Sequence, residues 1–125
     1  MTEDQEKLFL RLETADSHDR AALDDVARLL SEDVGRTKAG AAITPGDIKT
    51  TDEIVHLVDA VLPGWTIQIT GTAAEPDGHW HCTLRQSAIR DNDEFIGSGE
   101  GKILSHALLA ALLRTVLYLA DRKSA

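Results

Sequence analysis

The sequence lacks the features of several large protein classes. Its 125 residues contain one cysteine, Cys82, which cannot close an intramolecular disulfide. The longest apolar run, residues 103–120, is interrupted by His106 and Arg114, so it never reaches the roughly 18 uncharged apolar residues of a membrane-spanning helix. No internal repeat and no segment rich in Pro, Gln or Ser is present. These absences predict a single domain over residues 1–125 with no membrane partner.

Basic residues are few relative to acidic ones. The chain has 13 Lys and Arg against 21 Asp and Glu, a net charge of -8. A field of that sign repels phosphate and anionic lipid, so nucleic acid is a disfavoured partner. The opening MTEDQEKLFL is acidic where a signal peptide would be basic and then apolar, and we therefore expect a cytoplasmic protein.

The remaining composition is typical of a folded globular chain, with 42% apolar and 27% charged residues. Local patterns predict where its helices begin. At Thr2 and at Thr50 a threonine stands three residues before a Gln or Glu, which is the capping-box spacing. We expect one helix over 3–14 and another from Thr50 to the turn at Pro63-Gly64.

Apolar spacing predicts two more helices. Over 20–31 the apolar residues recur at i, i+3, i+4 and i+7. The last helix is expected to begin with Ser105 as its cap and carries leucines on two sides. Residues 31–49 show no sustained period and contain a Pro-Gly pair, so we interpret them as an ordered loop.

Alternating apolar and polar residues predict strands over 65–70 and 79–85, with Trp65 and Trp80 on the apolar face. A third, weaker strand is expected near 94–97, followed by the segment GSGEG, which has little side chain to pack. The predicted fold class is α+β. We expect a three-layer α/β/α sandwich, in which a small antiparallel sheet of about three strands is covered by helices on both faces.

Three segments carry a likeness to a known family. They are LFLRLETADSHDRAALDDVARLL at 8–30, TTDEIVHLVDAVLPGWTIQI at 50–69 and LSHALLAALLRTV at 104–116. In these segments the chain resembles the phage ABA sandwich domain, named for its α/β/α layers and found in phage and prophage proteins of unknown biochemical role. Residues 31–49 contain no matching anchor, and the last helix lacks the small or proline-containing start expected of the family. The resemblance implies a phage-like accessory protein and carries over no binding or catalytic residue.

A pair of histidines is the first candidate site. His79 and His81 stand two residues apart on one predicted strand, so both side chains project from the same face. Two neutral imidazoles so placed could share a zinc or nickel ion, with a further ligand from Asp77, His56 or His18. A solvated or helix-covered strand face explains the same pattern without a metal, and we prefer that interpretation.

Other patterns that suggest chemistry fail on spacing or direction. GSGEGK at 97–102 has three residues between its outer glycines where a phosphate loop needs four, and no Ser or Thr follows Lys102. Ser105 and His106 are neighbours on a helix, and their diverging side chains do not make a nucleophile and base pair. Alternation sends Cys82 to the apolar face, where burial raises a thiol pKa.

No convergent catalytic set emerges, so neither an enzyme activity nor a cofactor is predicted. The leading hypothesis is a non-enzymatic protein-interaction or assembly module that self-associates through surplus apolar residues of the last helix, Leu113, Leu117 and Tyr118. One alternative is a small metal- or ligand-binding protein that uses the His79 and His81 face. Another is a nucleic-acid-binding module with the topology of a double-stranded-RNA-binding domain, which the net charge of -8 disfavours.

Overall fold

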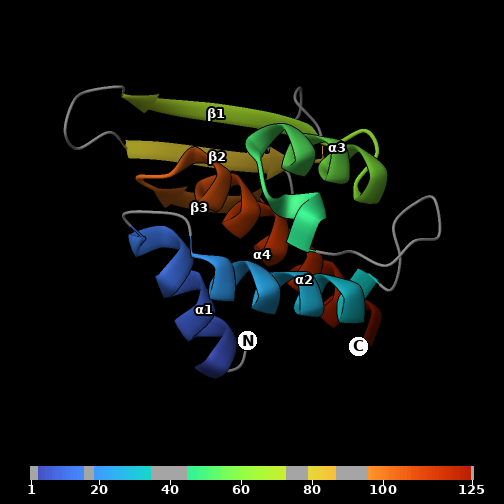
Figure 1. Ribbon diagram of the computed structural model, residues 1–125. Helices are drawn as coiled ribbons and strands as arrows, with labels where there is room; N and C mark the ends of the chain where they lie inside the picture. Colours follow the sequence, from blue (N-terminus) through green and yellow to red (C-terminus); the bar gives the residue numbers. More distant parts are fainter. Residues whose placement is uncertain (1–2, 16–18, 35–44, 73–78, 87–95, 125) are drawn as a thin grey trace.

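Helices make up most of the computed structural model, which describes residues 3–15, 19–34, 45–72, 79–86 and 96–124. Within these ranges the elements are, in order, α1 (Glu3–Thr14), α2 (Arg20–Val34), the short 3-10 helix η1 (Pro45–Ile48), α3 (Thr51–Val61), β1 (Thr66–Thr72), β2 (His79–Arg85), β3 (Ile96–Gly101) and α4 (Leu104–Ser124) (Figure 1). The strands form one antiparallel sheet in the order β1-β2-β3. The α+β class and the three-stranded antiparallel sheet are thereby confirmed.

Local capping explains where α3 begins. The Oγ1 of Thr50 accepts a hydrogen bond from the Glu53 N–H at 3.2 Å and donates one to the Glu53 carboxylate at 3.0 Å. The expected N-cap at Thr50 is therefore confirmed, whereas the Glu53 carboxylate accepts from the Thr50 hydroxyl and not from the backbone N–H of a capping box. Helix α1 has the expected bounds, although the Thr2 of its predicted capping box lies outside the described residues. Helix α2 ends at Val34, later than the residue 31 expected from its apolar pattern.

The segment 31–49, which was expected to be an ordered loop, contains helical residues on both sides of 35–44. Residues 31–34 belong to α2, and residues 35–44 lie outside the described part of the chain. The end of the segment forms η1, and its Ile48 is fully buried in the core. A core contact therefore fixes the chain just before α3 starts.

The two faces of the sheet differ in character. Residues of the inner face pack towards the helices, and the register places the following side chains or glycines there: Ile67, Ile69, Trp80, Cys82, Leu84, Gly97 and Gly99. Residues of the outer face alternate with them: Gln68, Thr70, His79, His81, Thr83, Ser98 and Glu100. Trp80 lies on the inner face as expected, while Trp65 precedes β1 and packs against the same core.

Strand β3 differs from the strand that the sequence suggested. It covers Ile96–Gly101, so the glycine-rich segment expected to follow the strand is itself the strand. The reason is its contact with α4. A Cβ atom at Gly97 would collide with Thr115 Oγ1, and one at Gly99 would collide with the carbonyl oxygen of Ala107. Glycine weakens an isolated strand, but here it lets the helix backbone approach the sheet closely.

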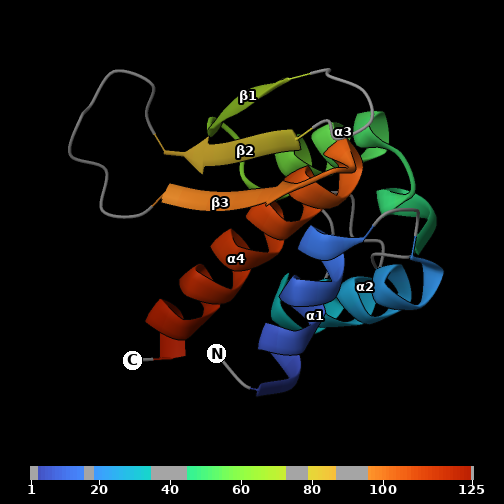
Figure 2. The same ribbon diagram turned by 90° about the vertical axis from the view of Figure 1, so that its left-hand side faces the viewer.

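Helix α4 is enclosed by the rest of the chain. Every residue from 105 to 113 is buried. Strands β2 and β3 contact α4 on one side, and α1, α2 and α3 contact it on others (Figure 2). A helix that is apolar all round belongs in the interior of a fold, which explains the leucines on several sides of this one. No helix in the described ranges combines the length and hydropathy needed to cross a bilayer.

Two expectations about α4 are corrected by this enclosure. Leu113 is fully buried within its own chain and cannot meet a partner, whereas Leu117 and Tyr118 are half-buried. Ser105 does not cap the helix, because α4 already begins at Leu104 and the Ser105 side chain lies buried in its first turn. The apolar residues that suggested a second contact surface instead fill the core.

The order of the layers also differs from helix, sheet, helix. In the described part of the chain the helices lie on the inner-face side, so the layers run from the sheet to α4 and then to α1 and α2 (Figures 1 and 2). Gln68, Thr70, His79 and His81 on the outer face are exposed. Antiparallel sheets commonly keep one solvated face, and the polar outer residues of this sheet fit that arrangement.

Candidate functional site

An ion pair closes the free edge of β3. Arg114 on α4 donates from Nη1 and Nη2 to the two carboxylate oxygens of Glu13 at the end of α1, at 2.8 and 2.7 Å. The same two side chains hold the strand backbone. Arg114 Nη1 also donates to the Ser98 carbonyl at 2.6 Å, and the Glu100 N–H donates to Glu13 Oε2 at 3.0 Å. These side chains thus occupy backbone groups that an additional strand would need.

The surroundings of this ion pair strengthen it. The Arg114 and Glu13 side chains are only 29% and 18% exposed, and the guanidinium carbon lies 4.4 Å from the centre of the Phe9 ring. Burial by itself raises the pKa of the Glu13 carboxyl. The hydrogen bonds from Arg114 and from the Glu100 N–H outweigh burial, so the pKa of Glu13 lies below its ordinary value of 4.5. Glu13 therefore stays ionised, and the closure persists at neutral pH.

Sequence reasoning missed this closure. Glu13 and Arg114 are 101 positions apart, so no local spacing links them. The signal that was present is Arg114 within the mostly apolar run 103–120, since a charge placed there requires a partner.

The opposite edge of the sheet belongs to β1. In the described part of the chain β1 pairs with β2 on one side and with no strand on the other. The sequence of β1, TIQITGT, contains no charged residue and no proline. Its Ile69 is 39% exposed although it lies on the inner face. Natural edge strands are commonly protected by charges, prolines, bulges or a covering element, and the side chains of β1 supply neither charge nor proline.

The hydrogen-bond pattern shows which residues of β1 present their backbone to that edge. The Ser98 carbonyl accepts from Arg114 and the Glu100 N–H donates to Glu13, so the backbone groups of these two residues point away from β2. Directions alternate along antiparallel strands. Following the register across β2, Gln68 and Thr70 direct their backbone groups to β2, and Ile67 and Ile69 direct theirs to the free edge.

The two histidines of the predicted metal site lie on the outer face, as expected. His79 Nε2 is 3.5 Å from Glu100 Oε2 on β3, with side chains 56% and 60% exposed. His56 lies elsewhere, on α3, with its Nε2 3.8 Å from Asp52. Asp77 and His18 lie outside the described residues. Among the residues that the structure describes, no three His, Cys, Asp or Glu side chains are grouped so that they could hold a metal ion.

The other residues weighed for chemistry lie in the core. Cys82 is fully buried, and burial raises the pKa of its thiol to about 11. Ser105 and His106 are also buried, in the first turn of α4. The segment 97–101 of the rejected phosphate loop is strand β3, and the N–H of its Glu100 is already bonded to a carboxylate.

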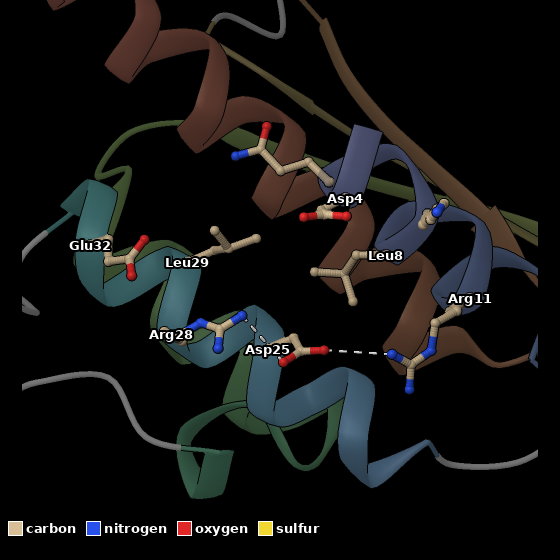
Figure 3. A pocket seen from close by; sticks show the side chains of 9 residues that line it. Asp4, Leu8, Arg11, Asp25, Arg28, Leu29 and Glu32 are labelled. Atoms are coloured by element: carbon tan, nitrogen blue, oxygen red, sulfur yellow. Dashed lines mark ion pairs between the residues drawn. The ribbon is translucent and has the colours of Figure 1, made fainter. Parts of the chain in front are cut away.

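A groove of about 700 Å³ runs between α1 and α2. Figure 3 shows Leu8 and Leu29 extending into it from the two helices, with Asp25 between Arg11 and Arg28. Asp25 lies 3.5 Å from Arg11 and 3.4 Å from Arg28. The charged lining residues are three acids and three bases: Asp4, Lys7, Arg11, Asp25, Arg28 and Glu32. Charges of both signs alternate in this groove, so it offers no field that would select a ligand of one sign.

At one end of this region Asp19 joins the start of α2 to α1. Its carboxylate accepts from the Ala22 N–H at 3.0 Å and from Arg11 Nη2 at 3.0 and 3.1 Å. The hydrogen bond from the Ala22 N–H, together with those from Arg11, holds the pKa of Asp19 below its ordinary value of 3.8, against the opposing effect of burial. The Asp19 carboxylate therefore caps α2 and also joins it to α1, so this ion pair has a structural role.

Comparisons with known proteins name no family for this chain. A scan against models of protein families found no match, and searches of curated proteins and of solved structures found none either. The two edges of the sheet and the chemistry of its exposed faces therefore provide the evidence on function.

Proposed function

We propose that this chain is a non-enzymatic protein-interaction module, and that the free edge of β1 is its interaction element. The observation that carries the proposal is the contrast between the edges. Glu13 and Arg114 occupy backbone groups of β3, whereas Ile67 and Ile69 direct theirs to an uncharged edge of β1. An extended segment of a partner could add to β1 as a further strand, gaining main-chain hydrogen bonds and side-chain contacts.

The placement of the reactive side chains supports a role without catalysis. Cys82, Ser105 and His106 are buried in the core. The exposed His79 lies 3.5 Å from Glu100, and these two side chains have no third group in the described ranges with which to hold a metal. The phage-like setting of the module is part of the proposal and rests on the sequence resemblance alone.

The pairing of basic side chains with carboxylates argues against the alternative of a nucleic-acid-binding module. Lys7, Arg11, Arg28 and Arg114 each lie within 4 Å of a carboxylate. Basic side chains beside acids do not form the basic patch that backbone binding requires. A protein partner is therefore favoured over a nucleic acid.

Selection of extended peptides tests the proposal. The purified chain, attached at low density so that copies do not meet, would be screened against displayed random peptides of about ten residues, long enough to pair along one strand. We expect selected peptides to alternate apolar and polar residues and to protect the Ile67 and Ile69 amides from hydrogen exchange. An Ile69→Lys variant should lose at least about tenfold in affinity, because an edge lysine opposes strand addition.

Leu10→Lys is the matched control. Like Ile69, Leu10 is an exposed apolar residue; it is 63% exposed and lies on α1, away from the sheet edge. Its substitution should leave peptide binding unchanged. Selected peptides that bind Ile69→Lys as well as the original chain would show that β1 is not the interaction element.

A further inference from the structure

The residues of β1 are arranged so that the strand is complementary to itself. Residues 66–70 read Thr-Ile-Gln-Ile-Thr, the same in both directions about Gln68. We propose that β1 pairs antiparallel with β1 of a second copy of the chain, about a two-fold axis at Gln68, so that two three-stranded sheets become one continuous sheet. This inference rests on the proposed function and identifies its partner.

The directions of the backbone groups fit this register. Ile67 and Ile69 present their N–H and carbonyl groups to the free edge, and pairing about Gln68 sets Ile67 opposite Ile69 of the second copy. Both members of each such pair can therefore exchange hydrogen bonds. A register shifted by one residue would set these groups against residues whose backbone is already bonded to β2. The sequence symmetry and the hydrogen-bond pattern thus select the same centre.

The side chains fit as well. On the inner face, Ile67 and Ile69 of the two copies would lie side by side, covering part of Ile69, which is 39% exposed in the single chain. On the outer face, Thr66 would lie opposite Thr70, and the two Gln68 amides would face each other. No charged residue of β1 would lie along the seam, so the net charge of -8 does not place like charges across it.

Closure of the other edge sets the size of the assembly. Each copy would use its β1 edge in the two-fold contact, and its β3 edge is held by Glu13 and Arg114. An isologous contact that consumes the open edge of both copies ends growth at two. The expected assembly is a dimer, not a filament.

Disulfide trapping at the two-fold axis tests the proposal. In a Gln68→Cys variant the introduced side chains of the two copies would face each other as a non-hydrogen-bonded pair. Cβ atoms of such a pair lie about 4.5 Å apart, so a disulfide can form with small adjustment. Gln68 is exposed, so Gln68→Cys should fold normally and should form a covalent dimer under mild oxidation. The natural Cys82 is buried and does not compete.

Thr70→Cys is the matched control, since it is exposed on the same face of the same strand. In the proposed register the two introduced thiols are offset by four residues, about 13 Å, and cannot bond directly. Mixing Thr66→Cys with Thr70→Cys should restore cross-linking, because those positions face each other. Light scattering should give twice the chain mass for the original protein, and Ile69→Lys should lower the dimer fraction at least about tenfold.

These experiments distinguish a failure of β1 self-pairing from a failure of the β1 edge as the interaction element. Monomeric mass at high micromolar concentration together with no Gln68→Cys cross-link would overturn self-pairing. Equal cross-linking of Gln68→Cys and Thr70→Cys would overturn the register, because it indicates random collision. If self-pairing fails while selected peptides still protect the Ile67 and Ile69 amides, the interaction edge stands and its partner is another protein. If both experiments fail, the proposed function fails with the dimer.

Discussion

Glu13 and Arg114 lie at opposite ends of the sequence, yet their side chains jointly close the free edge of β3. Their mutual hydrogen bonds are 2.7 and 2.8 Å long, and each side chain also bonds a backbone group of the strand. One contact therefore fastens α1, α4 and the sheet together. The closure protects one edge of the sheet, whereas within the described residues no strand pairs with the other.

Replacing Glu13 should destabilise the fold. Glu13→Ala leaves the half-buried Arg114 guanidinium without its carboxylate and the Glu100 N–H without its acceptor, which should cost about 2 kcal/mol. Glu13→Gln keeps the shape but loses the charge and should cost less. Urea unfolding followed by tryptophan fluorescence measures both. Lys7→Ala is the control, because its pair with Glu3 is 68% and 84% exposed and should contribute under about 0.5 kcal/mol. Equal losses for Glu13→Ala and Lys7→Ala would contradict the structural role of the closure.

Stability should fall in acid through the same carboxyl. The pKa of Glu13 is lower in the folded chain than its ordinary value of 4.5, so protonation favours the unfolded state. Its contribution is complete above about pH 4.5 and is lost as the pH falls through the lower, folded pKa. Asp19 acts in the same direction from its ordinary value of 3.8. Urea unfolding at a series of pH values should show a smaller loss between neutral and acidic pH for Glu13→Gln than for the original chain. An identical loss in both would show that Glu13 is not one of the responsible groups.

Features that depend on neighbouring residues could be predicted from the sequence. The N-cap of α3 at Thr50 and the strand over His79–Arg85 lie where they were expected, because short-range hydrogen bonds and side-chain alternation define them. The position of His79 and His81 on one face follows from the same alternation. Their lack of a third metal ligand in the described ranges does not, because it depends on which elements fold near them.

Features that depend on tertiary contact could not be predicted in the same way. The leucines on several sides of α4 were a correct signal of extra apolar contact, but the sequence does not say whether a partner or the rest of the chain supplies it. Leu113 shows that the chain supplies it. The glycines of β3 disfavour a strand on local grounds, and only the approach of α4 makes them suitable. The edge closure joins residues 101 positions apart.

The contact between β3 and α4 can be tested by adding a single methyl group. Gly99→Ala would place a Cβ against the Ala107 carbonyl oxygen and 2.7 Å from the Ala111 nitrogen, both of which are backbone atoms of α4. The helix would have to move, and overpacking of this kind should cost about 2 to 3 kcal/mol in urea unfolding. Ser98→Ala on the neighbouring outer-face position is the control and should change stability by less than about 0.5 kcal/mol. If Gly99→Ala were as stable as Ser98→Ala, α4 would not pack directly on the strand.

Native Cys82 should resist alkylation. Its side chain is fully buried, and burial raises the pKa of the thiol to about 11, so at about pH 8 only about one thiol in a thousand is the reactive thiolate. Iodoacetamide should therefore label the folded chain far more slowly than the urea-unfolded chain, as measured by intact mass. Thr70→Cys supplies an exposed thiol on the same sheet, and this variant should gain one label rapidly while Cys82 stays unmodified. Rapid labelling of native Cys82 would show that the inner face of the sheet opens to solvent, and it would contradict the packing of α4 on β2. The assignment of the open and closed edges of the sheet assumes that packing.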